Sequence, residues 1–111
     1  MNVETSQTGS TAVAAVSGRV DSANAKEFEE ELSAIIDKGA TGLVVDCGEL
    51  NYISSAGLRV FLIAIRKTSA AGGGLALCRV PDHINEVLEI SGFSRLAKVF
   101  ETVEEARDSF G

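Results

Sequence analysis

Two adjacent serines, Ser54 and Ser55, stand where an apolar strand and a loop give way to a long helix. A hydroxyl at this position can cap the helix, because it accepts a hydrogen bond from a free first-turn N–H group. It can also be a modifiable hydroxyl, since unpaired N–H groups and the positive end of the helix dipole favour an attached phosphate. Capping accounts for most serines at such positions, whereas modification would change what can dock there.

The pattern around these serines does not fit a catalytic nucleophile. A nucleophile elbow needs a glycine two residues to either side of its serine, and Ser55 has Gly57 after it but Ile53 before it. His83 is the single histidine, and a surface or capping role is expected for it. No helix carries a His-Glu-x-x-His or similar metal spacing. We therefore expect no enzymatic activity, no metal site and no cofactor.

Three acidic residues, Asp21, Asp46 and Glu49, are expected nearest the serines. They could form a weak cation site or supply a general base. The structural alternative is that Asp46 ends a strand and caps nearby backbone amides. A phosphate adds about −1.5 to −2 charges at pH 7. Crowded by these acids, it would change the charge and bulk that a partner meets, with little change in the fold.

The helix that follows the serines carries Arg59, Ile63 and Arg66 at i, i+4 and i+7 on its expected outer side. Two arginines that flank an exposed isoleucine are typical of a small protein-binding face. The alternative is a solvated stripe with one incidental apolar residue. Arginines near Ser55 could also contact a phosphate or an acidic partner.

The composition is that of one domain, residues 1–111, with 45% hydrophobic residues and a net charge of −6. An acidic chain is a poor match for nucleic acid or for an anionic membrane surface. Cys47 and Cys78 lack metal-type spacing and are expected to be buried free thiols. No signal peptide is visible, and the apolar stretch 58–65 is too short to span a membrane. A reducing cytoplasm is the expected location.

Hydrophobic periodicity predicts the elements that position these residues. After the strand at 43–45, residues 46–51 are expected to form a loop, and Leu58, Phe61, Leu62 and Ile65 should form the core-facing stripe of the serine helix. Strands and helices alternate from there on, which favours parallel strands joined by right-handed crossovers. The other strands are expected at 2–8, 11–16, 75–80 and 99–100, with 18–21 in a loop, and the other helices at about 23–38, 83–91 and 103–110. Gly9 should mark a turn, and Gly39 and Gly92 should end helices. Asp82 can cap the helix at 83–91, and Thr102 with Glu105 predicts a capping box for the last helix.

Val45-Asp46, the run from Tyr52 to Leu58 and the upstream Gly18-Arg19-Val20-Asp21 resemble the signature of STAS domains, the sulfate-transporter and anti-sigma-factor-antagonist family. The stand-alone bacterial antagonists are the nearest match. In that motif Ser54 stands at the place of an aspartate, Ser55 at that of the phosphoacceptor and Ala56 at that of a second hydroxyl residue. The missing aspartate leaves Ser54 as a rival acceptor. The resemblance implies an α/β fold, a central mixed sheet with about four helices packed mainly on one side.

The resemblance also implies a function. The unphosphorylated antagonist would bind an anti-sigma factor that is also a serine kinase, and this would free a sigma factor. The kinase would inactivate the antagonist by phosphorylating Ser55 with ATP, and a PP2C-type phosphatase would remove the phosphate. The family's aspartates at the places of Asp21 and Asp46 lie beside the phosphoacceptor. The expected partner-binding residues are Asp21, Asp46, Ser54, Ser55, Gly57, Arg59, Ile63 and Arg66.

A second interpretation is a STAS-type module that binds a small ligand or serves a transport or lipid-trafficking complex. In that case Ser54 and Ser55 would cap the helix or hold the ligand, without phosphorylation. An independent hydrolase or nucleotide-binding enzyme fits the sequence least.

Overall fold

Five strands form one mixed sheet in the order β1-β2-β3-β4-β5, in a computed structural model that describes residues 1–110. The strands are β1 (Asn2–Thr8), β2 (Thr11–Val20), β3 (Gly42–Ile53), β4 (Gly74–Cys78) and β5 (Lys98–Phe100). The β1–β2 pair is an antiparallel hairpin, and the other neighbours are parallel. Gly9 lies in the hairpin turn with φ of +62°, a left-handed conformation that glycine adopts without strain.

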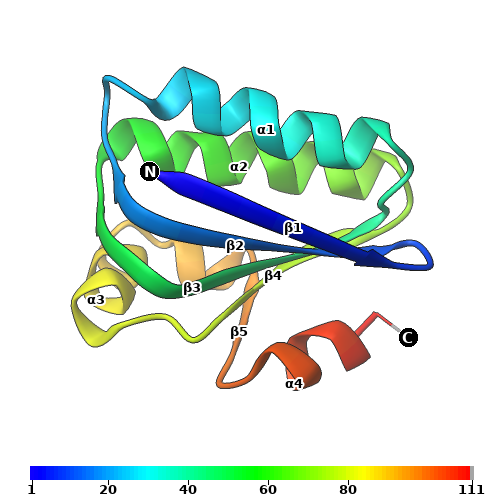
Figure 1. Cartoon of the computed structure of the whole chain (residues 1–111). Helices are drawn as coiled ribbons and strands as arrows, with labels where there is room; N and C mark the ends of the chain where they lie inside the picture. Colours follow the sequence, from blue (N-terminus) through cyan, green and yellow to red (C-terminus); the bar gives the residue numbers. More distant parts are fainter. Residues whose placement is uncertain (111) are drawn as a thin grey trace.

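The helices are α1 (Ala25–Asp37), α2 (Ser55–Ala70), α3 (Asp82–Ile90) and α4 (Val103–Asp108), with a 3₁₀ turn at Phe93–Arg95. Figure 1 shows α1 and α2 side by side over one face of the sheet, with α4 against the other. The main core lies under α1, α2 and α3, where Phe61 packs on Phe28 and Phe93 at centroid distances of 5.7 and 5.6 Å. The predicted mixed sheet with its helices mainly on one side is confirmed.

The predicted loop at 46–51 is wrong, because β3 runs without a break from Gly42 to Ile53. Two shifts in the β2–β3 register absorb the extra residues of β3. Cys47, Leu50 and Ile53 then all reach the main core, so burial holds the chain extended through a polar stretch. The loop predicted at 18–21 is likewise strand as far as Val20.

The serine helix forms as predicted, but its buried face differs from the predicted stripe. The buried residues are Gly57, Val60, Phe61, Ala64 and Thr68. Gly57 and Ala64 are small, so the helix axis lies close to the sheet; a Cβ on Gly57 would come within 2.7 Å of the Ile53 side chain. Of the predicted stripe only Phe61 is buried, while Leu58, Leu62 and Ile65 are half-buried at its flanks.

The predicted helix caps are confirmed in part. Thr102 and Glu105 form the expected capping box: the Thr102 hydroxyl accepts from the Glu105 amide at 3.1 Å, and the Glu105 carboxylate accepts from the Thr102 amide at 3.2 Å. The predicted Asp82 cap is wrong, because Pro81 is the N-cap residue of α3 and Asp82 is the first helical residue. No helix within residues 1–110 has the length and apolarity needed to cross a bilayer.

Candidate phosphorylation and docking site

The end of β3 and the start of α2 are joined at one residue, Ser54. Its N–H donates to the carbonyl of Val20 at 2.9 Å, and its own carbonyl accepts from the Leu58 N–H at 3.0 Å. Its side-chain oxygen accepts from the Gly57 N–H at 3.2 Å, which is N-cap geometry. Ser54 is half-buried, and all three of its polar groups are engaged. Ser54 is therefore the capping residue.

Ser55 is the first residue of α2, and it is exposed. Its hydroxyl makes no hydrogen bond to any group in residues 1–110. Because Gly57 and Leu58 already donate to Ser54, the first-turn N–H groups left without a helical partner are those of Ser55 and Ala56. The geometry thus places an accessible hydroxyl beside two free amides at the positive end of a helix.

Asp21 lies beside this turn, as predicted, because it follows Val20, the backbone partner of Ser54. Its carboxylate accepts from the N–H groups of Ala23 at 3.0 Å and Asn24 at 3.3 Å. The Asn24 side chain accepts in turn from the Asp21 N–H at 2.9 Å. The result is a negative charge held at a fixed place next to the serines.

Arg19 and Tyr52 form a pair that the sequence interpretation missed. They are opposite each other in the β2–β3 ladder, and the Arg19 guanidinium lies 4.5 Å from the centre of the Tyr52 ring. Arg19 also approaches Asp21 at 3.8 Å, while Tyr52 is 42% exposed. The sequence could reveal this pair only if the register of the two strands were known. Arg19 directly precedes Val20 and Tyr52 directly precedes Ile53, and Val20 and Ile53 are opposite each other in the sheet.

Asp46 and Glu49 do not crowd the serines, so that part of the prediction is wrong. Asp46 is opposite Ala15 and Ile53 is opposite Val20, which places Asp46 five residues of β2 away from the serine turn. At about 3.3 Å per residue this is roughly 16 Å, well beyond the screening length of about 8 Å at physiological salt. Glu49, opposite Ser17, is about 10 Å back along the same strand.

Asp46 instead has a structural role within the sheet. It does not end a strand, but it caps a backbone amide as expected, because its carboxylate accepts from the Gly48 N–H at 3.0 Å. The same carboxylate pairs with Arg79 Nη1 at 3.0 Å. Arg79 has a positive φ of 54°, and its guanidinium fills the space where a side chain on Gly48 would be. Asp46 therefore holds a strained arginine at the end of β4.

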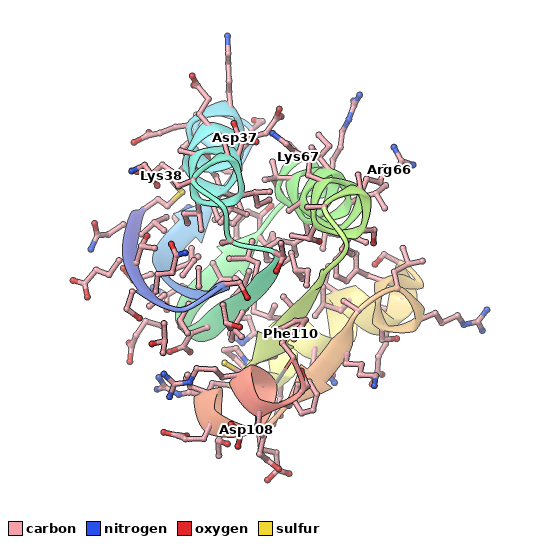
Figure 2. All side chains as sticks on the ribbon, turned by 90° about the vertical axis from the view of Figure 1, so that its right-hand side faces the viewer. Asp37, Lys38, Arg66, Lys67, Asp108 and Phe110 are labelled. Carbon is pink, nitrogen blue, oxygen red and sulfur yellow. The ribbon has the colours of Figure 1, made fainter. Side chains whose placement is uncertain are left out.

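The outer face of α2 is basic. The helix carries Arg59, Arg66 and Lys67 and has no acidic residue, although the chain as a whole has a net charge of −6. Arg59 and Arg66 are exposed, as predicted. Ile63 was predicted to be exposed, but it is half-buried. Figure 2 shows Arg66 directed away from the sheet, while Lys67 pairs with Asp37 of α1 at 3.4 Å.

The remaining reactive side chains are occupied or buried. His83 Nε2 lies 2.7 Å from the Asn51 carbonyl oxygen. Cys47 and Cys78 are free and buried in the two separate cores. Burial raises the pKa of both thiols, that of Cys78 to about 11, with Asp46 adding to the effect. Within residues 1–110, no three His, Cys, Asp or Glu side chains are grouped so that they could hold a metal ion.

A five-stranded mixed sheet, a serine-capped helix after its central strand and an exposed serine at the start of that helix define a small α/β domain. The STAS domain family model matches residues 2–106. The chain therefore belongs to the STAS domain family. A Bordetella bronchiseptica protein provisionally named anti-sigma factor antagonist BtrV is 45% identical over 98 residues, which are 88% of this chain and 84% of the relative.

Solved structures show the same fold. The anti-sigma factor antagonist SpoIIAA in its unphosphorylated form superposes with a TM-score of 0.83 at 23% identity, covering 97% of this chain and 95% of that one. The phosphorylated form of SpoIIAA, described as a Bacillus cell fate determinant, superposes with a TM-score of 0.75 at 24% identity, covering 97% and 98%. One fold thus matches SpoIIAA in both phosphorylation states.

Proposed function

We propose that this protein is an anti-sigma factor antagonist that is switched by phosphorylation at Ser55. The observation that carries the proposal is the division of roles at the start of α2: Ser54 makes the cap, and Ser55 leaves a free hydroxyl on the surface. A residue that is needed for capping cannot be modified without cost to the helix, whereas Ser55 can be.

The relatives support this function. The Bordetella protein has a name of this class and matches most of both chains. An antagonist of this kind acts by binding. In this proposal the partner is an anti-sigma factor with serine kinase activity. The proposed location is the cytoplasm. The kinase transfers the γ-phosphoryl group of ATP to the Ser55 oxygen, with release of ADP and a proton, and a PP2C-type phosphatase returns the hydroxyl. Ser55 is a substrate residue here, and the protein itself is not an enzyme.

The docking surface in this proposal surrounds Ser55. Asp21 supplies a fixed negative charge on one side, and Arg59 and Arg66 supply positive charges along α2, with half-buried Ile63 between them. Gly57 acts through its lack of a side chain, because it allows α2 to approach the sheet. Asp46 acts on the fold of the sheet and not by direct contact at the serine turn.

A phosphate at this place would block docking with little change of fold. The two free amides and the helix dipole favour the anion within the domain. An approaching partner meets about −1.5 to −2 added charges and the bulk of the group. Backbone amide spectra of the two forms should therefore match away from Ser55, and widespread shifts would contradict this mechanism.

The test is mass spectrometry with phosphosite mapping after incubation with kinase-competent native lysate and ATP. We expect one phosphate on Ser55 and none in Ser55→Ala. Modification at Ser54 would move the acceptor by one residue and contradict the division of roles. Absence of phosphate would favour the ligand-binding or transport module, and co-purification with a membrane or transporter subunit would establish it.

Docking is tested separately by Arg59→Glu in a pull-down of the anti-sigma factor. We expect binding to fall about tenfold or more, since a charge reversal at an interface creates repulsion. Arg95→Glu makes the same charge change at an exposed position on the 3₁₀ turn and serves as the matched control. Equal binding by folded Arg59→Glu and by wild type would refute the docking surface.

A further inference from the structure

Ser55 and Arg59 are separated by one helical turn. Both are exposed on α2, at positions i and i+4, which face the same side of a helix with about 6 Å between their Cβ atoms. Helical side chains lean toward the N-terminus of their helix. The long Arg59 side chain can therefore reach back over the turn that begins with Ser55.

Arg59 makes no ion pair within residues 1–110, where the ion pairs are Arg19–Asp21, Lys67–Asp37 and Arg79–Asp46. The first turn of α2 also contains no acidic residue. A cation close to the positive end of a helix dipole is an unfavourable arrangement when no anion is present. Arg59 is thus placed where an anion on Ser55 would correct the local charge balance.

We propose that Arg59 is the intramolecular partner of the phosphate on Ser55. The inference rests on the proposed function and adds how phosphorylation produces the form that does not bind the partner, which we call the off state. In the unphosphorylated protein Arg59 is available to an acidic partner surface, which the basic outer face of α2 favours. After phosphorylation the guanidinium pairs with the phosphate one turn away. The modification thus adds a negative charge and at the same time removes a positive docking group.

Other cations are less well placed to take this role. Arg19 is engaged by Tyr52 and Asp21. Arg66 is on the same helix as Arg59, but it is eleven residues from Ser55, about 16 Å along the axis. Lys26 is exposed at the start of α1, and Figure 1 shows that α1 and α2 begin at the same end of the molecule. Lys26 is therefore the competing cation that the experiment must separate from Arg59.

The experiment installs phosphoserine at position 55 by genetic code expansion, so that no kinase is needed. The second pKa of the phosphate, near 6 in an unpaired phosphoserine, is then followed by ³¹P NMR titration. A nearby guanidinium favours the dianion and lowers this pKa, so Arg59→Gln should raise it by about half a unit or more. Arg66→Gln removes the same charge from the same helix three turns away and should leave the pKa unchanged.

An equal phosphate pKa in the Arg59→Gln and Arg66→Gln proteins would overturn the inference. A rise in Lys26→Gln without one in Arg59→Gln would also overturn it and assign the phosphate to α1. These outcomes are independent of the proposed function, because the phosphate is introduced during synthesis. A lysate that fails to phosphorylate Ser55 would overturn the switch, whereas the titration reports only on the pairing of the phosphate.

Discussion

The Ser54 hydroxyl accepts a hydrogen bond from the Gly57 N–H at 3.2 Å and so caps the helix that begins at Ser55. This contact separates two hydroxyls that are indistinguishable in the sequence. Ser54 stands where the family motif has an aspartate. Serine and aspartate both cap helices well, so the N-cap acceptor is kept, but it is neutral. The exchange removes one negative charge next to Ser55 and leaves the helix start intact.

Ser54→Ala should lower the free energy of unfolding by about 1 kcal/mol, because it removes the cap. Ser55→Ala should change it by less than about 0.5 kcal/mol, since the exposed hydroxyl bonds to nothing in the described chain. Urea denaturation of the two variants is the measurement, and each serves as the control for the other. Equal losses would show that Ser55 also has a structural role.

Gly57→Ala should destabilise the protein, although alanine is the better helix former by about 1 kcal/mol. The new Cβ would lie 2.7 Å from Ile53 Cγ1 and 2.8 Å from Val20 Cγ1, so α2 would have to move away from the sheet. Overpacking of this kind costs about 1 to 3 kcal/mol. Urea denaturation gives the sign, and Ser69→Ala, at an exposed position of α2, is the control. A stabilised Gly57→Ala protein would show that the helix can shift freely.

The sequence predicts elements where local signals agree with the final packing. Gly9, Gly39 and Gly92 mark a turn and two helix ends, and each has a positive φ in the structure. Thr102 and Glu105 predict their capping box because both partners lie within one helical turn. The position of Ser55 at a helix start belongs to the same class of local signals.

Features that depend on neighbouring strands were not predictable in this way. Residues 46–51 read as a loop because their polar and glycine residues interrupt the apolar run, yet pairing with β2 keeps them extended. The same ladder places Asp46 far from the serines and brings Arg19 onto Tyr52. No local pattern encodes the two register shifts, and so sequence reasoning missed both outcomes.

The rotation of α2 has a similar origin. Leu58, Leu62 and Ile65 have the spacing of a core stripe, and hydrophobicity alone selects them. The sheet instead receives the face with Gly57 and Ala64, because small residues permit a closer approach over Val20 and Ile53. Periodicity locates an apolar stripe, whereas packing decides which of two adjacent stripes is buried.

Asp46→Asn tests the structural role assigned to Asp46. The amide oxygen can still accept from the Gly48 N–H, but the charge pair with Arg79 is lost. Because the Arg79 side chain is 48% exposed, the guanidinium can turn to solvent, and we expect a loss of about 1 kcal/mol or less. Urea denaturation at low and high salt measures it, with a smaller loss at high salt. Partner binding should stay within about twofold, and a loss as large as that of Arg59→Glu would place Asp46 in the interface.

The two cysteines should be unreactive in the folded protein. With a pKa of about 11, Cys78 has about a thousandth of its thiol ionised at pH 8, against about a quarter for an ordinary cysteine. Cys47 is fully buried, and its pKa is raised further. The thiol reagent DTNB should label both cysteines at once in denaturant and neither within minutes in buffer. Because burial raises the pKa of both thiols in the folded state, their contribution to the free energy of unfolding is fully present below about pH 8.5, the pKa of an ordinary cysteine. The contribution of Cys78 is lost as the pH rises from there toward about 11. Rapid labelling of the native protein would contradict this environment.

Phosphorylation of Ser55 should stabilise the domain while it blocks docking. The phosphate would meet the free N–H groups of Ser55 and Ala56 and the positive end of the helix dipole, worth about 1 kcal/mol. Asp21 opposes this gain, whereas Asp46, roughly 16 Å from the serine turn along β2, is screened by salt. We expect a net rise in melting temperature of about 2 to 4 °C, measured by calorimetry on protein with phosphoserine installed at position 55.

Phosphoserine at Ser69, exposed in the last turn of α2, is the matched control and should lower the melting temperature, because the dipole is negative there. A lower melting temperature for both proteins would mean that repulsion from Asp21 outweighs the helix start, and the off state would then involve a loosened α2.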